Sequence, residues 1–446
     1  MVLLIDNWNA DAARLVYSLK NAGYLFHAVV LQYDGFCAEG VSSPYEYFLY
    51  GGQVPEQCSP LYFDKLQIPE YFEMESSNSS GEVREFDTVR ARVFYAEPRE
   101  NRYVRIVDWL DGSGKVCCSD HYDRFGHRFA QTVLSEKQKP VHKTYYRPDG
   151  AEVITENFLT GDIILTWHGK ELFFHTKTEF VLYYLQQAFE QIDRIFYNSL
   201  SFPFFVANQY CNRVKKLKDN VLFWQEGIGA DIPGNMKGIL EHDLAGTSVI
   251  AVQHKDAFEN LQKLSIDQSR FAKLGFIYPR LRENAHSGNL LVFTNSDQIE
   301  QLEQLAVRLN DVHIHIAALT EMSAKLMQMV KYPNIQLYPV VTQKQIQTLW
   351  DSCDIYLDIN HGGEILDAVE TAFKNRELIL GFQNTLHKMD LVTEKYIFTP
   401  DENGAAAMAE QIHNVLSDKN RMDEELEYQW KHANAETVEQ YRKILR

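Results

Sequence analysis

Residues 354–382 carry the sequence DIYLDINHGGEILDAVETAFKNRELILGF, which decides the fold of the second half of the chain. Residues 355–359 form a short β-branched and aromatic run typical of a buried strand, and residues 360–363 form a glycine-containing turn. Leu378–Phe382 is a second apolar run. The stretch between them has apolar residues at helical spacing: Ile365, Ala368, Val369, Ala372 and Phe373. This order predicts a βαβ unit whose turn presents helix N–H groups above a parallel sheet.

The same stretch resembles the donor-nucleotide corner of retaining glycosyltransferases of the GT-B class. Members of that class usually carry two glutamates eight positions apart, one at the start of the helix near the sugar and one inside the helix. Glu370 matches the second glutamate, but the position eight residues before it is Gly362, which has no carboxylate. Glu364 lies two residues further on, and on a sharp turn such a shift aims the side chain differently. The sequence therefore predicts the fold of this class with a broken donor site.

The expected diphosphate-binding cations are also missing. Retaining GT-B enzymes usually place an arginine and a lysine after the first strand of the second domain, because two cations neutralise the charge that develops on the leaving group. Here residues 291–303 read LVFTNSDQIEQLE, with no arginine or lysine and with acidic residues at Asp297, Glu300 and Glu303. Such a segment repels a diphosphate, so no catalytic residue is expected in this chain.

The amino-acid composition disfavours several classes of function. The chain has 446 residues with 44 Lys and Arg against 61 Asp and Glu, a net charge of -17, which disfavours nucleic acid as a partner. The six cysteines form no CxxC pair, as expected for reduced thiols in the cytosol. The amino terminus lacks the features of a signal peptide, and no apolar run is long enough to cross a membrane. A cytoplasmic protein is expected, with peripheral association at the cytoplasmic face of the membrane left open.

The amino-terminal half begins as an α/β domain and then changes character. Val2–Ile5 and residues 26–31 are predicted strands on either side of a helix, and the first loop lacks the GxGxxG pattern of a dinucleotide site, so no cofactor is expected. From residue 66 to 175, short alternating runs are separated by turn signals at residues 111–114, 123–126, 147–150 and 167–170. This pattern predicts an antiparallel meander. Because long sheet edges usually need covering, the meander is expected to contact a partner, with a purely structural sheet as the alternative.

After residue 175 the α/β pattern resumes. Predicted strands at Thr247–Val252, Leu290–Phe293 and Ile335–Tyr338 alternate with helical stretches. The fold class is α/β and GT-B-like: two Rossmann-like domains, the first with the meander inserted. The predicted boundaries are 1–65 and 176–283 for the first domain, 66–175 for the insertion, 284–425 for the second domain, and 426–446 for a helix crossing back to the first.

The other candidate metal-binding and catalytic residues give only weak indications of function. His313 and His315 alternate along a predicted strand, and His121 and His127 flank a hairpin turn, so both pairs are interpreted as structural and no metal site is predicted. Asp358 ends a predicted strand, where polar residues are common. No nucleophile elbow, zinc-protease motif or Walker lysine is present in the sequence.

The chain resembles the GtfB family, the non-catalytic subunits of bacterial GtfA–GtfB O-GlcNAc transferases. The resemblance lies in the order of these features, in Asp6-Asn7-Trp8-Asn9 of the first loop, and in the loss of both the donor carboxylate and the diphosphate-binding cations. The resemblance implies a stabilising subunit that binds the acceptor polypeptide for a GtfA-like catalytic partner. The implied acceptors are serine-rich repeat adhesins, modified from UDP-GlcNAc before export by the accessory Sec system. Acceptor contacts are expected at Trp8, Asn9, His361 and Glu364. Two alternatives stay open: an active GT-B enzyme that uses Glu364 as a displaced donor carboxylate, and a nucleotide-sugar epimerase.

Overall fold

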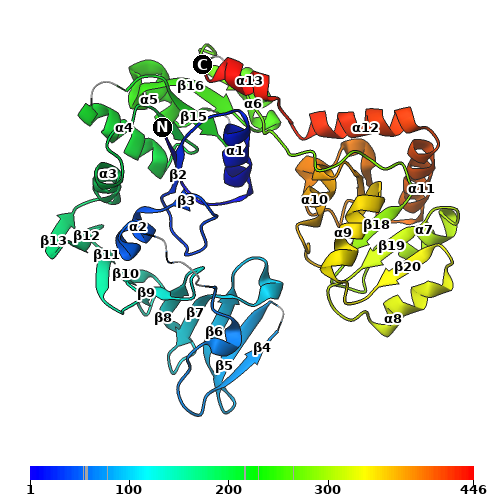
Figure 1. Cartoon of the computed structure of the whole chain (residues 1–446), viewed down its shortest axis with the longest axis horizontal. Coiled ribbons are helices and arrows are strands. Elements are labelled where there is room, and N and C mark those ends of the chain that lie inside the picture. The colour runs from blue at the N-terminus through cyan, green and yellow to red at the C-terminus, as the bar shows by residue number, and fades with distance from the viewer. Residues whose placement is uncertain (54, 56–58, 78, 215–216, 230, 265) are drawn as a thin grey trace. The chain divides into compact units, whose positions relative to one another are not determined.

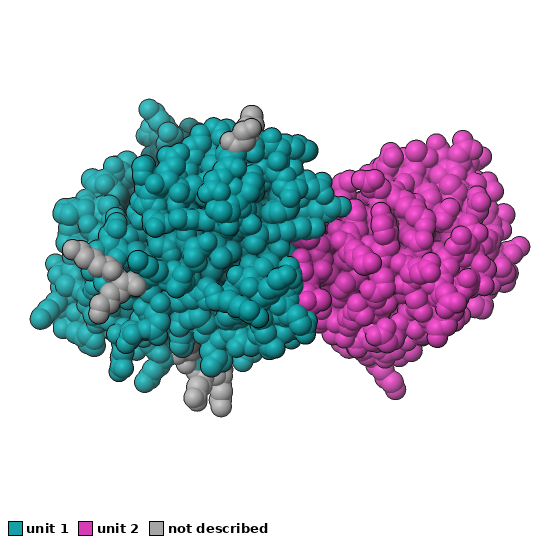
Figure 2. Space-filling view, turned by 90° about the horizontal axis from the view of Figure 1, so that it is seen from above, with its two compact units in different colours: residues 1–275, 438–446 teal, residues 276–437 magenta. Residues whose placement is uncertain are grey.

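The computed structural model describes residues 1–446 apart from 54, 56–58, 78, 215–216, 230 and 265. Cys58 therefore lies outside the described residues, and the other cysteines are free thiols. The chain divides into two compact units, coloured separately in Figure 2. Unit 1 comprises residues 1–275 and 438–446, and unit 2 comprises residues 276–437.

Unit 1 is built on a parallel sheet of seven strands, in the order β17-β16-β15-β14-β1-β2-β3. The central strand β1 is the sequence VLLI, buried at every position, as expected for a parallel strand covered on both faces. The strands are β1 (Val2–Ile5), β2 (His27–Val30), β3 (Val41–Ser42), β14 (Ile195–Tyr197), β15 (Asn220–Trp224), β16 (Thr247–Val252) and β17 (Phe271–Lys273). The helices are α1 (Ala10–Asn21), α2 (Pro44–Tyr50), α3 (Lys177–Ala188), α4 (Phe202–Val214), α5 (Gly234–His242), α6 (Lys255–Gln262) and α13 (Val438–Ile444).

The predicted meander is a ten-stranded antiparallel sheet inserted between α2 and α3, with each strand beside its neighbour in sequence (Figure 1). All the predicted turns join consecutive strands. Part of its core is a cluster that includes Val83, Val93 and Val107, each fully buried. The strands are β4 (Glu73–Ser76), β5 (Ser80–Glu85), β6 (Thr88–Tyr95), β7 (Val104–Leu110), β8 (Val116–Tyr122), β9 (Arg128–Leu134), β10 (Pro140–Tyr146), β11 (Glu152–Asn157), β12 (Ile163–Trp167) and β13 (Lys170–Phe174).

Unit 2 contains a six-stranded parallel sheet in the order β20-β19-β18-β21-β22-β23. With unit 1 and the insertion, this gives the predicted GT-B-like α/β class. The strands are β18 (Leu290–Phe293), β19 (Ile314–Ala317), β20 (Ile335–Tyr338), β21 (Ile355–Asp358), β22 (Leu378–Phe382) and β23 (Ile397–Phe398). The helices are α7 (Leu302–Arg308), α8 (Ala324–Met327), α9 (Gln343–Ser352), α10 (Ala368–Lys374), α11 (Glu402–Leu416) and α12 (Lys419–His432).

The βαβ unit at residues 354–382 is confirmed, with a later helix start than its pattern indicates. Leu366 and Asp367 have φ angles of 57° and 50°, so the chain makes a left-handed turn before α10 begins at Ala368. Ile365 is buried ahead of the helix and belongs to the turn. Left-handed backbone is costly for side chains such as leucine, and a local apolar pattern does not reveal it.

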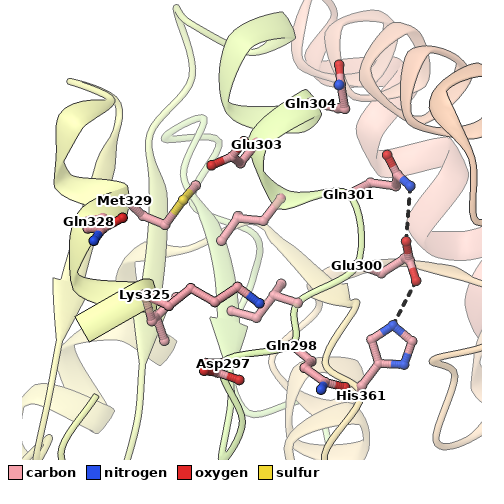
Figure 3. Close-up of a pocket in the computed structure, with 13 residues that line it drawn as sticks. Asp297, Gln298, Glu300, Gln301, Glu303, Gln304, Lys325, Gln328, Met329 and His361 are labelled. Atoms are coloured by element: carbon pink, nitrogen blue, oxygen red, sulfur yellow. Dashed lines mark hydrogen bonds and ion pairs between the residues drawn. The ribbon is translucent and has the colours of Figure 1, made fainter. Parts of the chain in front are cut away.

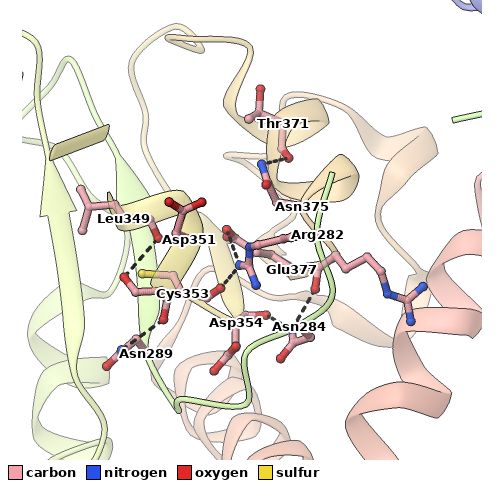
Figure 4. A network of polar contacts seen from close by, with 12 residues as sticks. Arg282, Asn284, Asn289, Leu349, Asp351, Cys353, Asp354, Thr371, Asn375 and Glu377 are labelled. Atoms are coloured by element: carbon pink, nitrogen blue, oxygen red, sulfur yellow. Dashed lines mark hydrogen bonds and ion pairs between the residues drawn. The ribbon is translucent and has the colours of Figure 1, made fainter. Parts of the chain in front are cut away.

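A buried polar network fixes the segment that enters unit 2 (Figure 4). One Arg282 guanidinium nitrogen, Nη2, donates to the Cys353 carbonyl and lies 3.3 Å from Glu377 Oε1. Glu377 is completely buried, and burial raises the pKa of its carboxyl group while Arg282 opposes that shift. The Asn284 side chain donates to the carbonyls of Asp354 and Arg376. These contacts tie residues 282–284 to the amino ends of β21 and β22.

The single helix predicted for residues 426–446 is wrong, because the chain forms two helices there. Asn434 has a φ angle of 54° and lies between α12 and α13. Trp430 of α12 stacks on Phe373 of α10, with ring centroids 4.6 Å apart, so α12 packs within unit 2. The Tyr441 hydroxyl of α13 donates to the Gly275 carbonyl at 2.6 Å, and Arg442 donates to the Ala22 carbonyl at 3.0 Å. The last helix is therefore part of unit 1.

Candidate functional site

The turn between β21 and α10 is filled by a side chain from another loop. A Cβ atom added at Gly362 would lie 1.7 Å from Asn295 Oδ1, so the Asn295 side chain would have to move to make room for it. Asn295 follows β18, and the neighbouring Thr294 hydroxyl donates to Asn360 Oδ1 at 2.8 Å. In this arrangement Gly362 leaves the space that the Asn295 side chain fills, and its backbone is not left-handed. The place where the GT-B class carries its first glutamate is occupied by Asn295.

Glu364 lies in the turn before α10, and its carboxylate is bound to the start of that helix. Its Oε1 accepts a hydrogen bond from the Val369 amide at 2.9 Å, and its Oε2 lies 3.5 Å from Lys388 Nζ. Burial raises the pKa of Glu364, and Lys388 and the Val369 amide lower it. Its carboxylate is therefore engaged at the start of α10, which is a poor arrangement for a displaced donor ligand.

Glu370 is neutralised by lysines of the same unit. Its Oε1 lies 2.7 Å from Lys374 Nζ and its Oε2 lies 3.7 Å from Lys388 Nζ. Lys388 also forms an ion pair with Asp367. Lys388 sits in the loop after β22 and joins three carboxylates of the turn, and no local pattern in the sequence indicates this role. Both candidate donor carboxylates are thus occupied by this chain's own cations.

His387 holds the glycine turn in place. Its Nδ1 lies 2.6 Å from Asp358 Oδ1, its backbone N–H donates to Asp358 Oδ2 at 2.8 Å, and its Nε2 lies 2.8 Å from the Gly362 carbonyl. The hydrogen bond to Asp358 raises the pKa of His387 to about 9, against burial. With both ring nitrogens facing acceptors, the protonated imidazolium fits this position best. Asp358, which sequence alone placed only at a strand end, is the buried partner that keeps His387 charged.

We expect the stability of the chain to fall as the pH rises past the pKa of His387. The folded-state pKa lies above the ordinary value of 6.5, so the stabilisation is complete below about pH 6.5 and is lost as pH rises through about 9. The difference corresponds to about 3 kcal/mol. Denaturant unfolding of the full chain at pH 6.5 and pH 9.5 measures it.

The matched variant for that experiment is His387→Gln, which keeps a polar side chain but cannot carry the charge. It should lower stability at pH 6.5 and should lose most of the difference between the two pH values. If the stability of wild type and variant changes equally between pH 6.5 and pH 9.5, groups other than His387 cause the change.

A cavity of about 520 Å³ opens beside this turn (Figure 3). It lies between the β18–α7 loop, α7 and α8. The His361 imidazole lies 2.7 Å from Glu300 Oε2, and Asn384 donates to the same oxygen at 2.9 Å. Lys325 reaches into the cavity from α8. The lining residues are Asp297, Gln298, Ile299, Glu300, Gln301, Leu302, Glu303, Gln304, Lys325, Leu326, Gln328, Met329 and His361.

The chemistry of this cavity suits hydroxyl and amide groups better than a diphosphate. Asp297, Glu300 and Glu303 all line it, as the sequence of this segment indicated, and Lys325 is the one lysine among the lining residues. Lys325 comes from α8, so the sequence of the β18–α7 segment does not predict its presence in the cavity. The carboxylates accept hydrogen bonds from neutral polar groups, and the glutamine amides both accept and donate them. The negative charge of the carboxylates repels phosphate.

The predicted acceptor contacts fall in both units and have different surroundings. Asn9 is the N-cap of α1, because its Oδ1 accepts from the Ala12 amide at 2.8 Å. Trp8 is half-buried beside it, in unit 1. His361 and Glu364 belong to the turn in unit 2, where His361 lines the cavity and Glu364 binds its own helix. Trp8 and His361 keep surface open to a ligand, and all four acceptor contacts remain predictions.

The histidine pairs have structural surroundings. His315 Nδ1 lies 2.9 Å from the Tyr338 hydroxyl, and His121 Nε2 lies 2.8 Å from the Thr132 hydroxyl. Across the part of the chain that the structure describes, no group of three or more His, Cys, Asp or Glu side chains could hold a metal ion. Within the same residues, no helix combines the length and apolar character needed to cross a membrane.

Family models match this chain in four segments. The GtfB N-terminal domain matches residues 2–48, the GtfB middle domain residues 72–175, the GtfB third domain residues 177–264, and the GftB/GlyA-F C-terminal domain residues 290–429. The middle-domain match covers the inserted antiparallel sheet.

Curated relatives match the chain along its full length. It is 38% identical over 448 residues to the UDP-N-acetylglucosamine–peptide N-acetylglucosaminyltransferase stabilizing protein GtfB of Streptococcus agalactiae, covering 100% of this chain and 99% of that protein. The protein of the same name from Streptococcus gordonii is 37% identical, covering 100% and 98%. A chain in the crystal structure of a GtfA/B complex bound to UDP and GlcNAc superposes with a TM-score of 0.90 at 36% identity, covering 99% of this chain and 98% of that chain. This chain therefore belongs to the GtfB family of non-catalytic stabilizing proteins.

Proposed function

We propose that this chain is the stabilising and acceptor-binding subunit of a protein O-GlcNAc transferase, working with a GtfA-type catalytic partner. The observation that carries the proposal is the donor corner, where Asn295 fills the space at Gly362 and Lys388 neutralises Glu364 and Glu370. A GT-B-like unit without a free donor site retains concave polar surfaces at the carboxyl ends of its strands. Such surfaces suit a polypeptide that a partner enzyme then modifies.

The inserted sheet offers a surface for that partner. At its β12–β13 end, Ile163 and Phe174 face α3, where the Phe174 and Phe180 rings are 5.8 Å apart. Their neighbours Ile164 and Phe173 pair across the two strands and point to the opposite face, 39% and 57% exposed. Phe158 and Leu159 are exposed in the adjacent turn. We call Phe158, Leu159, Ile164 and Phe173 the apolar edge patch; exposed apolar groups of this kind favour a protein interface.

The acceptor and the cellular setting follow from the family resemblance. We infer that the acceptors are serine- and threonine-rich polypeptides of the serine-rich repeat adhesin class, modified with N-acetylglucosamine from UDP-GlcNAc before export by the accessory Sec system. The complex then works in the cytoplasm or at the cytoplasmic face of the membrane.

A transfer assay tests the proposed function. Labelled UDP-GlcNAc and a Ser/Thr-rich polypeptide are incubated with this chain alone, with the partner alone, and with both. We expect no transfer by this chain alone and a large gain when it is added to the partner. Sugar on the polypeptide with this chain alone would contradict the non-catalytic assignment, and an unchanged partner would contradict the stabilising role.

Trp8→Ala tests the acceptor contact in unit 1. Loss of a half-buried tryptophan surface should weaken acceptor binding about tenfold without changing the melting temperature. Fluorescence anisotropy of a labelled acceptor polypeptide measures the affinity. Tyr17→Ala, which removes a 37%-exposed aromatic ring from α1, is the matched control and should leave binding unchanged. Unchanged binding in Trp8→Ala with a normal melt would remove Trp8 from the site.

A further inference from the structure

Two lysines lie over aromatic rings where the inserted sheet meets α2 and α3 in unit 1. Lys143 of β10 lies 4.9 Å from the Tyr145 ring centroid and 5.6 Å from that of Phe129. Lys177, the first residue of α3, lies 5.4 Å from the Tyr45 ring and 5.3 Å from that of Phe202. The two tyrosine rings stack at 4.7 Å, so each cation covers one member of a stacked pair.

The nearest carboxylate does not pair with either lysine. Glu156 is the cross-strand neighbour of Lys143, yet its two oxygens accept hydrogen bonds from the hydroxyls of Tyr45 and Tyr145, the latter at 2.8 Å. Among the described residues, no carboxylate lies within ion-pair distance of either lysine Nζ. One buried, doubly hydrogen-bonded carboxylate therefore stands beside two ammonium groups that make no ion pair.

The two ammonium groups lack an ion-pair partner, and their burial has a cost. Both lysines are half-buried, and ring faces replace only part of the stabilisation that a direct anionic partner gives a buried cation. Burial lowers the pKa of Lys143 to about 8, with Lys177 acting in the same direction and Glu156 and Asp34 opposing it. Burial also lowers the pKa of Lys177, against Glu156 and Asp6. An anion that reached these ammonium groups would relieve the cost of burying them.

The position of the cluster connects it to the predicted acceptor loop. Asp6, which acts electrostatically on Lys177, begins the β1–α1 loop that carries Trp8. Its Oδ1 accepts from the Gln32 side chain at 2.8 Å, and Asp34 Oδ1 accepts from the Phe36 amide at 3.0 Å. The local acidic residues are thus hydrogen-bonded elsewhere. An extended ligand lying over this loop would bring its own charged groups to the lysines.

We propose that Lys143 and Lys177 bind a carboxylate carried by the acceptor polypeptide, so that this chain selects Ser/Thr-rich segments that also contain acidic residues. The inference rests on the proposed function, because the ligand is the acceptor polypeptide. In an unmodified polypeptide, the anionic side chains are those of aspartate and glutamate. Ammonium–carboxylate hydrogen bonds are charge-assisted and gain strength beside apolar rings.

Two synthetic peptides test the proposal with the full chain. One is a Ser/Thr-rich peptide with regularly spaced glutamates, and the other has glutamine at those positions. Wild type should bind the glutamate peptide about tenfold more tightly. The double variant Lys143→Met and Lys177→Met keeps the apolar stems and should bind both peptides with the affinity of the glutamine peptide. Lys137→Met with Lys139→Met, exposed in the β9–β10 turn of the same sheet, is the control and should keep the preference.

The outcomes separate this inference from the proposed function. Equal binding of both peptides by wild type overturns the carboxylate site and leaves acceptor binding standing. No binding of either peptide contradicts acceptor binding itself, and the carboxylate site falls with it. An equal loss of both peptides in the Lys143 and Lys177 variant, with a lowered melting temperature, assigns these lysines a structural role and also overturns the proposal.

Discussion

The double variant Ile164→Asp and Phe173→Asp is expected to fold normally and to lose its complex with the catalytic partner. The Ile164 side chain is 39% exposed and that of Phe173 57%, and the two pair directly across β12 and β13, so aspartates there remain in contact with water. In an interface, the same changes would bury two unpaired carboxylates next to each other. We expect the affinity for the partner to fall by at least about 100-fold, measured by co-purification and titration.

Phe86→Asp is the matched control for the apolar edge patch. Phe86 is 87% exposed and lies in the β5–β6 turn of the same inserted sheet, away from the β12–β13 edge in strand order. It should leave the complex intact. If the double variant binds the partner normally while its melting temperature is unchanged, the edge patch is not the interface. Loss of binding in Phe86→Asp alone would move the interface to the other end of the sheet.

Arg282→Ala is expected to destabilise unit 2 by about 3–5 kcal/mol, because it leaves Glu377 buried without its cation. The Arg282 side chain is 14% exposed and that of Glu377 is fully buried, so water cannot replace the lost partner. The variant also removes the donor to the Cys353 carbonyl. Denaturant unfolding of the full chain measures the loss.

Arg280→Ala is the control for that experiment. Arg280 pairs with Glu427 at 3.2 Å, but both side chains are more than 40% exposed, at 43% and 44%, and such pairs are worth about 1 kcal/mol or less. A second variant, Arg282→Met with Glu377→Leu, should be more stable than Arg282→Ala, because it removes the buried charge together with its partner. If Arg282→Ala lowers the free energy of unfolding no more than Arg280→Ala does, the Arg282–Glu377 pair does not stabilise unit 2.

The sequence predicted the central strands of both parallel sheets because most of them are apolar runs. It did not predict the short edge strands β3, β17 and β23. Leu290–Phe293 and Thr247–Val252 were predicted with the bounds that the structure has. The inserted sheet was predictable from regular turns between alternating runs. The start of α10 was not, because left-handed residues at Leu366 and Asp367 interrupt an apolar pattern that continues past them.

For the candidate site, the sequence predicted only which donor-binding groups are missing. The sequence shows that Gly362 lacks a carboxylate and that residues 291–303 lack cations. It does not show that Asn295, far earlier in the chain, fills the space at Gly362, or that His387 and Lys388 occupy the remaining polar groups. These contacts join residues that become neighbours only after the parallel strands have assembled, and no local pattern encodes them.

The return of α13 to unit 1 has a consequence for the order in which the protein is made. Tyr441 is fully buried in unit 1, and residues 438–444 emerge from the ribosome only after all of unit 2. Unit 1 therefore keeps the surface beneath α13 uncovered until residues 438–444 have been made, after the whole of unit 2. During that interval the nascent chain exposes the apolar surface of unit 1 that α13 later covers. A binding partner or chaperone can contact this surface then, but not in the folded protein.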